Sequence, residues 1–229
     1  MCGRYVVAST FEEFSERLGL NIRSLFDFNP HWNAAPSQVL PVLTGDSDDA
    51  ANLVGMYWGL VPAWIKPGEK PKMTPINARS ETIAEKPMFR GLVKRNRCIV
   101  PANGFYEWKK VGSQKQPFYI HPTEDGDMMW FAGLTGGKID KGGEAIQSFT
   151  ILTTSPNHKM SDLHDRMPVI LTPADAAAWL DPTDDDFAHL EHLLVPAPDD
   201  AIDMYPVSKS VNSTRNDGPN LIDPEEDES

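Results

Sequence analysis

The pattern of apolar positions predicts a long helix near the start of the chain. Residues 10–28 place apolar side chains, beginning with Phe11 and Phe14, at intervals close to those of an α-helix. Thr10 is followed three residues later by Glu13, which is the arrangement of a capping box at a helix N-terminus. We therefore predict a helix over residues 10–28 whose N-cap is Thr10.

Short segments rich in β-branched and aromatic residues make up much of the remaining chain, and Gly, Pro and Asp residues separate them. This pattern predicts strands joined by turns. The predicted strands span residues 38–43, 53–61, 97–108, 117–121, 128–134, 147–154 and 168–171. Two further helices are predicted, at 173–180 behind the N-cap Thr172 and at 184–194. Together these elements predict an α+β fold: a mostly antiparallel sheet or open barrel with peripheral helices.

The domain organisation follows from the absence of an internal repeat and of a long Gly/Ser linker in the sequence. These features favour a single domain, which we place at residues 1–218. Residues 219–229 form an acidic tail that ends in PEEDES and is predicted to be disordered.

Composition excludes several classes of protein. The chain has 229 residues, of which 40% are apolar and 24% charged, as in ordinary globular proteins. No segment approaches the roughly 18 consecutive apolar residues of a membrane span, and no secretion signal opens the sequence. Cys2 and Cys98 are the two cysteines, too few for a disulfide framework. We expect a cytoplasmic protein with no membrane partner, associated with the nucleoid if it is bacterial.

Charge is distributed unevenly along the chain. The net charge is −12, but residues 175–229 hold 15 acidic and two basic residues, so the first 174 residues carry a net charge of +1. Residues 86–106 contain five basic and no acidic side chains. Because local fields attract polyanions more than net charge does, this stretch is either a phosphate-facing patch or an ordinary solvated surface.

Cys2 has the most distinctive chemistry in the sequence. Removal of Met1, which aminopeptidases perform when the second residue is small, would leave an α-amine and a thiol on adjacent carbons. An α-amine has a reference pKa of about 7.7–8.0, against about 10.4 for lysine, so more of it is unprotonated at neutral pH. With an aldehyde, the amine forms a Schiff base, and the thiol closes on it to give a thiazolidine. The alternative is that Cys2 is only a small residue that permits processing.

Three other polar residues are candidates for a site. Glu107 lies in a predicted strand, where apolar neighbours would favour the protonated carboxyl group and suit it to general acid catalysis. His164 precedes an apolar strand and can act as a general acid or base, and Asn77 can orient a substrate oxygen. Each also has a structural interpretation, as an outward-facing strand residue, a structural histidine and a turn residue.

Metal and cofactor motifs are not found in the sequence. Only His189 and His192 have the spacing of metal ligands, and they lie in an acidic segment with no cysteine nearby. The sequence contains no Walker loop, no dinucleotide-binding glycine pattern and no nucleophile elbow. We expect neither a metal nor a cofactor.

Six motifs occur in an order that resembles one family. They are MCGRY at 1–5, NAAPSQ at 33–38, WGLVPAW at 58–64, NARSET at 77–82, RCIVPANGFYEW at 97–108 and LHDRMPVIL at 163–171. The closing segment YPVSKSVNSTRNDGPNLI at 205–222 extends the resemblance over nearly the whole chain. The chain is similar to the SRAP (SOS response-associated peptidase) family. Bacterial YedK-type and vertebrate HMCES-type members of this family shield abasic sites in DNA by self-attachment through an N-terminal cysteine.

The resemblance implies a set of catalytic residues in a single SRAP-type domain. Cys2 would be the nucleophile, and Asn77, Glu107 and His164 would support it. An abasic site is mostly a closed hemiacetal, so an acid such as Glu107 or His164 would assist its opening. Closure of the thiol on the iminium would remove the electron sink that otherwise promotes strand cleavage.

The resemblance also implies a DNA-binding surface. Trp64 resembles an aromatic wedge, and Arg4, Arg79 and Arg166 resemble phosphate-contacting arginines, to which the basic stretch adds Arg90. We expect a monomer that binds single-stranded DNA containing abasic sites and has lyase-like crosslinking activity, with autoproteolytic removal of Met1 as a further activity. The alternatives are an N-terminal-cysteine peptidase or amidohydrolase, and a noncatalytic single-strand binding module.

Overall fold

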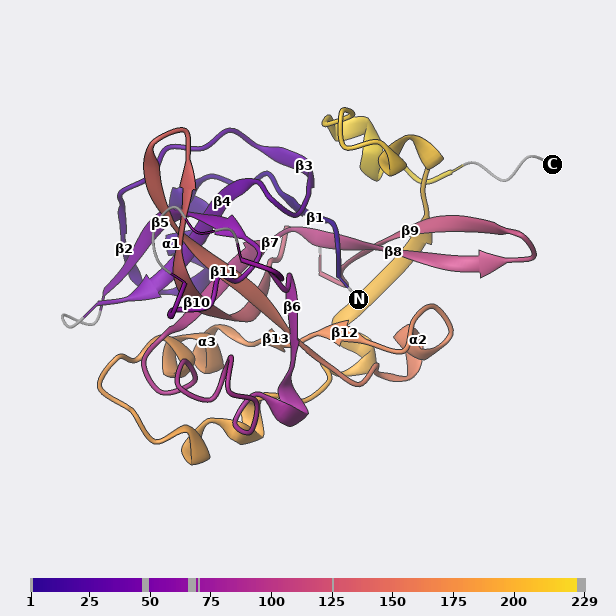
Figure 1. Cartoon of the computed structure of the whole chain (residues 1–229). Coiled ribbons are helices and arrows are strands. Elements are labelled where there is room, and N and C mark those ends of the chain that lie inside the picture. Colours follow the sequence, from indigo (N-terminus) through magenta and orange to yellow (C-terminus); the bar gives the residue numbers. More distant parts are fainter. Residues whose placement is uncertain (1, 47–49, 66–68, 70, 125, 226–229) are drawn as a thin grey trace.

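The computed structural model describes residues 2–46, 50–65, 69, 71–124 and 126–225. Five strands form a barrel at one side of the molecule (Figure 1). They are β4 (Val39–Gly45), β5 (Ala50–Trp58), β7 (Arg97–Ala102), β10 (Met129–Lys141) and β11 (Glu144–Thr154). Parallel pairing of β11 with β5, in which Ser148 lies opposite Tyr57, joins the two ends of the sheet. The predicted open barrel is therefore closed.

A second, antiparallel sheet stands beside the barrel in the strand order β14-β9-β8-β1-β3. These strands are β1 (Tyr5–Val7), β3 (His31–Ala34), β8 (Gly104–Val111), β9 (Gln114–Pro122) and β14 (Ile202–Pro206). Figure 1 shows the β8–β9 hairpin extending away from the barrel, with the C-terminal helical turns close to it.

Short strands and helices complete the fold. β2 (Asn21–Ser24) pairs with β5, β6 (Asn77–Arg79) and β12 (Met167–Pro168) pair with β11, and β13 (Ile170–Leu171) pairs with β10. The helices are α1 (Phe11–Leu18), α2 (His158–Ser161) and α3 (Pro173–Leu180). This architecture confirms the predicted α+β class, and the helices at 11–18 and 173–180 confirm two of the predicted elements.

The first helix begins where the sequence predicts but ends early. Thr10 and Glu13 form the complete capping box, each side chain bonding the other's backbone N–H. Gly19 ends the helix in the left-handed conformation at φ 69°, which glycine adopts without steric cost. The following residues, Asn21–Ser24, leave the helical path to pair with β5, so the prediction of a helix to residue 28 was wrong.

Two other predicted elements differ from the structure. Residues 97–108 do not form one strand, because the backbone leaves the barrel at Asn103 and β8 enters the second sheet. The side-chain oxygen of Asn103 accepts a hydrogen bond from the backbone N–H of Ala8 at 2.7 Å and fixes this crossing point. Residues 184–194 form two 3-10 turns, Phe187–His189 and Glu191–Leu193, in place of a single α-helix.

The C-terminal residues close a second, small hydrophobic core. This core consists of Val6, Tyr106, Tyr119, Val207, Val211 and Leu221. Leu221, which is 1% exposed, lies in a 3-10 turn at Pro219–Ile222, and the backbone N–H of Glu225 donates to the carbonyl oxygen of Pro206 at 2.8 Å. The prediction of a disordered tail from residue 219 is therefore wrong for residues 219–225, and residues 226–229 lie outside the described residues.

Candidate functional site

Pairing of β1 with β8 brings the residues that precede β1, Cys2 among them, close to Glu107. In this antiparallel pair Tyr5 lies opposite Phe105, and the backbone N–H of Tyr106 donates to the carbonyl oxygen of Arg4 at 3.0 Å. Continuing this register toward the N-terminus sets Gly3 opposite Glu107, so Cys2 lies one residue beyond, and the charge of Glu107 acts on the Cys2 thiol. Both residues are buried, with exposed fractions of 0% for Cys2 and 4% for Glu107.

Burial controls the protonation of the Cys2 thiol. Desolvation raises its pKa well above the ordinary value, and the negative charge of Glu107 raises the pKa further. The thiol donates a long hydrogen bond, 3.8 Å, to the carbonyl oxygen of Arg4. The sulfur is therefore held as a protonated thiol at neutral pH.

Asn77 binds the backbone of the same cysteine. It lies at the start of β6, opposite Ile151 of β11, and its Nδ2 donates to the carbonyl oxygen of Cys2 at 2.9 Å. Its Oδ1 is buried and accepts no hydrogen bond from the described residues. A buried acceptor without a donor is costly, so this oxygen is suited to bind a hydroxyl or amine that enters the site.

His164 belongs to a neighbouring group of polar residues. The backbone N–H of Arg166 donates to its Nδ1 at 3.0 Å. The same nitrogen lies 2.9 Å from Asp165 Oδ1, so a protonated ring would form an ion pair there. Arg166 itself is bound by both oxygens of Glu81, at 2.6 and 2.9 Å, and by the carbonyl oxygen of Thr153 at 2.5 Å.

The short strand β6 connects these two groups. Asn77 stands at its first residue and contacts Cys2, while Arg79 stands at its last residue, two positions before Glu81. Hydrogen bonds from Arg166 lower the pKa of the Glu81 carboxyl below its ordinary value, and the charge of Arg79 adds to this effect. The ion pair thus anchors the loop that carries His164 to the strand that carries Asn77.

The residues predicted to contact DNA occupy different environments. Trp64 is 61% exposed in the loop after β5, and Arg79 and Arg90 are exposed. Arg166 differs, because its guanidinium is nearly buried in the ion pair with Glu81. Arg4 is half-buried, and its side chain donates to Asn33 Oδ1 and to two carbonyl oxygens near the C-terminal end of the chain.

Sequence reasoning missed three residues that organise the site. Glu81 holds Arg166, while Asn33 and Asn212 bind the side chains of Arg4 and Trp108. All three lie inside the segments that carry the family resemblance, and this was the signal in the sequence that could have identified them. Their pairing across 29 to 104 positions of sequence could not be inferred without the fold.

Other kinds of site find little support in the described part of the chain. Those residues contain no cluster of three histidine, cysteine, aspartate or glutamate side chains able to hold a metal ion. Within the same ranges, no helix has the length and apolar character needed to cross a membrane. Chemically, the arrangement offers a protonated thiol, a buried carboxyl group and an unsatisfied amide oxygen around one backbone position.

Sequence comparisons show proteins similar to this chain over nearly its full length. The abasic site processing protein YoqW of Bacillus subtilis is 40% identical over 226 residues, which cover 97% of this chain and 99% of that protein. The abasic site processing protein YedK of Escherichia coli is 32% identical, covering 98% and 100%. The abasic site processing protein HMCES of Gallus gallus is 36% identical, covering 86% of this chain and 67% of its own length.

Structural comparison gives the same relationship. A crystal structure of a protein from Bacteroides thetaiotaomicron superposes with a TM-score of 0.84 at 28% sequence identity, covering 98% of this chain and 100% of the other. The family model for SOS response associated peptidase (SRAP) matches residues 1–214. The motif order, the fold and these matches agree, and the chain belongs to the SRAP family.

Proposed function

We propose that this protein processes abasic sites in DNA by covalent attachment through Cys2. The relatives named above as abasic site processing proteins support the substrate class. The observation that carries the proposal is the buried Cys2 thiol within electrostatic reach of the buried carboxyl group of Glu107, with the carbonyl oxygen of Cys2 held by Asn77.

The first step would use the α-amine of Cys2 after Met1 has been removed. The carboxylate of Glu107 takes the proton of the anomeric hydroxyl group and delivers it to the ring oxygen of the sugar, so the bond between the anomeric carbon and the ring oxygen breaks and the hemiacetal opens to the aldehyde. The amine adds to the aldehyde carbon, and loss of water gives an iminium. The unsatisfied Oδ1 of Asn77 would bind the amine or the released hydroxyl group during this step.

The second step would close the ring. The Cys2 sulfur bonds to the iminium carbon, the C=N electron pair returns to nitrogen, and the thiol proton passes to the Glu107 carboxylate. The net reaction converts an aldehyde and an aminothiol into a thiazolidine and water. Because the carbon is then saturated, it no longer acts as an electron sink for β-elimination, and the DNA strand is protected from cleavage.

The protonated thiol favours this order of steps over peptidase chemistry. A cysteine hydrolase attacks a weak electrophile and needs a thiolate, whereas burial and Glu107 both raise the pKa of the Cys2 thiol. An iminium is a stronger electrophile and can be captured as the proton leaves. The raised pKa of the Cys2 thiol therefore favours crosslinking over the peptidase alternative.

DNA would reach this site along exposed basic and aromatic residues. Arg79 and Arg90 would contact phosphates, Trp64 would stack on bases, and His164 would assist reversal by protonating the departing amine. Arg166 would add positive charge to the DNA-binding surface while it remains paired with Glu81. Stacking on aromatics favours single strands over duplex DNA.

A crosslinking assay with a single-stranded oligonucleotide tests the proposal. The protein should form a heat-stable adduct with an oligonucleotide carrying an abasic aldehyde, and none with the borohydride-reduced abasic oligonucleotide or with intact DNA. Mass spectrometry of the adduct should show a mass equal to both partners minus one water, with Met1 absent. A salt-sensitive complex without a covalent band would instead support a noncatalytic binding module.

The Cys2→Ser variant separates the two nucleophilic steps. It retains the α-amine, so it should form an iminium that borohydride traps, but no heat-stable adduct. Strand cleavage should rise relative to the wild type because the electron sink persists. Absence of both the trapped adduct and the cleavage would show that the amine is not the first nucleophile.

A further inference from the structure

The side chain of Arg4 is bound by the C-terminal part of the chain. Its Nη1 donates to Asn33 Oδ1 and to the carbonyl oxygen of Val211, each at 2.8 Å, and its Nη2 donates to the carbonyl oxygen of Asn212 at 3.4 Å. These contacts use three of the five N–H donors of the guanidinium. Since all three acceptors are uncharged, the other two donors and the positive charge remain for a phosphate.

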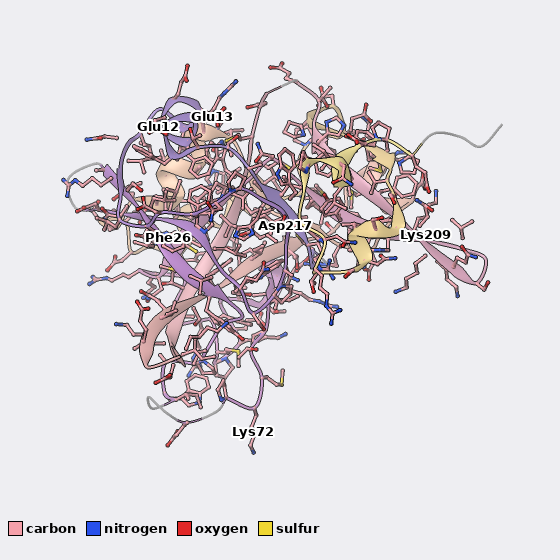
Figure 2. All side chains as sticks on the ribbon, turned by 90° about the horizontal axis from the view of Figure 1, so that it is seen from above. Glu12, Glu13, Phe26, Lys72, Lys209 and Asp217 are labelled. Atoms are coloured by element: carbon pink, nitrogen blue, oxygen red, sulfur yellow. The ribbon has the colours of Figure 1, made fainter. Side chains whose placement is uncertain are left out.

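Asn33 binds residues 211–216 to strand β3. Its side chain is almost fully buried, and its Nδ2 lies 3.2, 3.0 and 2.9 Å from the carbonyl oxygens of Val211, Ser213 and Asn216. Asp217 returns the contact by accepting from the backbone N–H of Asn33 at 3.1 Å. Figure 2 shows Asp217 near the middle of the molecule, between the barrel and the β8–β9 hairpin.

Asn212 contacts both the residues that follow Cys2 and the strand that carries Glu107. Its carbonyl oxygen accepts from Arg4, two residues after Cys2, and its Oδ1 accepts from the indole Nε1 of Trp108 at 2.7 Å. Trp108 directly follows Glu107 on β8. Asn212 therefore bridges the residues just before β1, which carry the thiol, and strand β8, which carries the carboxyl group.

We propose that residues 211–217, which we call the closing segment, are a positioning element that fixes Cys2 relative to Glu107, with Asn212 as the residue that joins the segment before β1 to strand β8. This inference rests on the proposed function. Val211 packs in the second core, so the closing segment is fixed at its first residue. Ring closure needs the sulfur, the iminium carbon and the proton acceptor in one geometry, and small misplacements of reacting groups lower rates steeply.

Three variants within the closing segment test this role. Asn212→Ala removes the acceptor for Trp108, while Asn212→Asp keeps an acceptor oxygen at the same place. Thr214→Ala is the matched control, because Thr214 is exposed and its side chain forms no hydrogen bond with the described residues. For each variant we would measure the rate of heat-stable adduct formation, the amount of borohydride-trapped iminium and the melting temperature.

If the closing segment positions Cys2, Asn212→Ala should change the ratio of heat-stable adduct to borohydride-trapped iminium. Asn212→Ala should slow formation of the heat-stable adduct by about tenfold or more, because the sulfur is misplaced relative to the iminium. Trapped iminium should then rise relative to the adduct, and Asn212→Asp should restore the ratio. Thr214→Ala should behave as the wild type.

Two other results would overturn either the role of the closing segment or the proposed function. If Asn212→Ala forms the adduct at the wild-type rate, or lowers both products in equal proportion, the closing segment does not position Cys2 and the inference is overturned. A wild-type protein that forms no covalent product would overturn the proposed function itself, which is a separate outcome.

Discussion

The carboxylate of Glu81 binds the guanidinium of Arg166 with both oxygens, at 2.6 and 2.9 Å. The two residues are 85 positions apart in the sequence, and their contact connects the segment after β6 with the loop before β12. Arg166 in turn donates its backbone N–H to His164. Arg166, predicted to bind phosphate, is thus nearly buried in an ion pair, and its backbone N–H binds His164.

This ion pair predicts a pH-dependent contribution to stability. The pKa of Glu81 is lowered in the folded protein, so its stabilising effect is present above the unfolded pKa, about 4.3, and is lost as the pH falls through the folded pKa. Glu81→Gln should reduce the free energy of unfolding at pH 7 by about 1–2 kcal/mol, discounted because Glu81 is 48% exposed. Urea unfolding at several pH values measures this.

The difference between Glu81→Gln and the wild type should shrink toward acid pH. Glu85→Gln is the matched control, since Glu85 is an exposed carboxylate in the turn that follows. A destabilisation that is the same at pH 3 and pH 7 would mean that the ion pair contributes nothing and that packing is responsible.

Glu107→Gln should slow crosslink formation while leaving noncovalent binding intact. The amide keeps the shape of the side chain but cannot transfer a proton, and loss of a general acid typically costs about 10²–10⁴ in rate. Single-turnover adduct formation measures the rate, and anisotropy with intact single-stranded DNA measures affinity. Glu144→Gln, at the exposed start of β11, provides the control. Crosslinking at the wild-type rate would remove Glu107 from the mechanism.

Arg79→Glu should weaken binding to intact and abasic single strands by the same factor. Phosphate contacts carry no information about the lesion, and each lost contact should reduce the salt dependence of log K by about 0.7. Fluorescence titrations at several salt concentrations measure both quantities. Arg17→Glu on α1 controls for net charge, and an equal loss of affinity in that variant would show that Arg79 makes no specific contact.

Two changes near the C-terminus, one deletion and one substitution, should differ in their effects on crosslinking and on stability. Deleting residues 226–229 removes three acidic side chains and should leave crosslinking unchanged or slightly faster, because these charges repel DNA. Leu221→Ala, in contrast, should cost about 2–5 kcal/mol by opening a cavity in the second core. Thermal and urea unfolding measure these effects, and a neutral Leu221→Ala would show that the turn is not part of the folded unit.

Local signals in the sequence predicted most of the elements that the structure contains. The capping box at Thr10 and Glu13 is decided by neighbours three residues apart, so its prediction was confirmed. The split at Asn103 depends on Ala8, 95 residues away, and no local pattern distinguishes it from a continuous strand. The same limit explains why Cys2 and Glu107 were each recognisable as candidates, while the role of Asn212 depended on the three-dimensional arrangement.

The link between Arg4 and Val211, 207 positions apart, has a consequence for the newly made chain. During synthesis Cys2 emerges first, whereas Glu107 and the segment that fastens its strand follow much later. Contacts of such long sequence separation form only when the intervening chain has been made and folded. The surroundings of Cys2 are therefore completed last although Cys2 is synthesised first, and an incomplete polypeptide carries the Cys2 thiol without Glu107 and the contacts that position it.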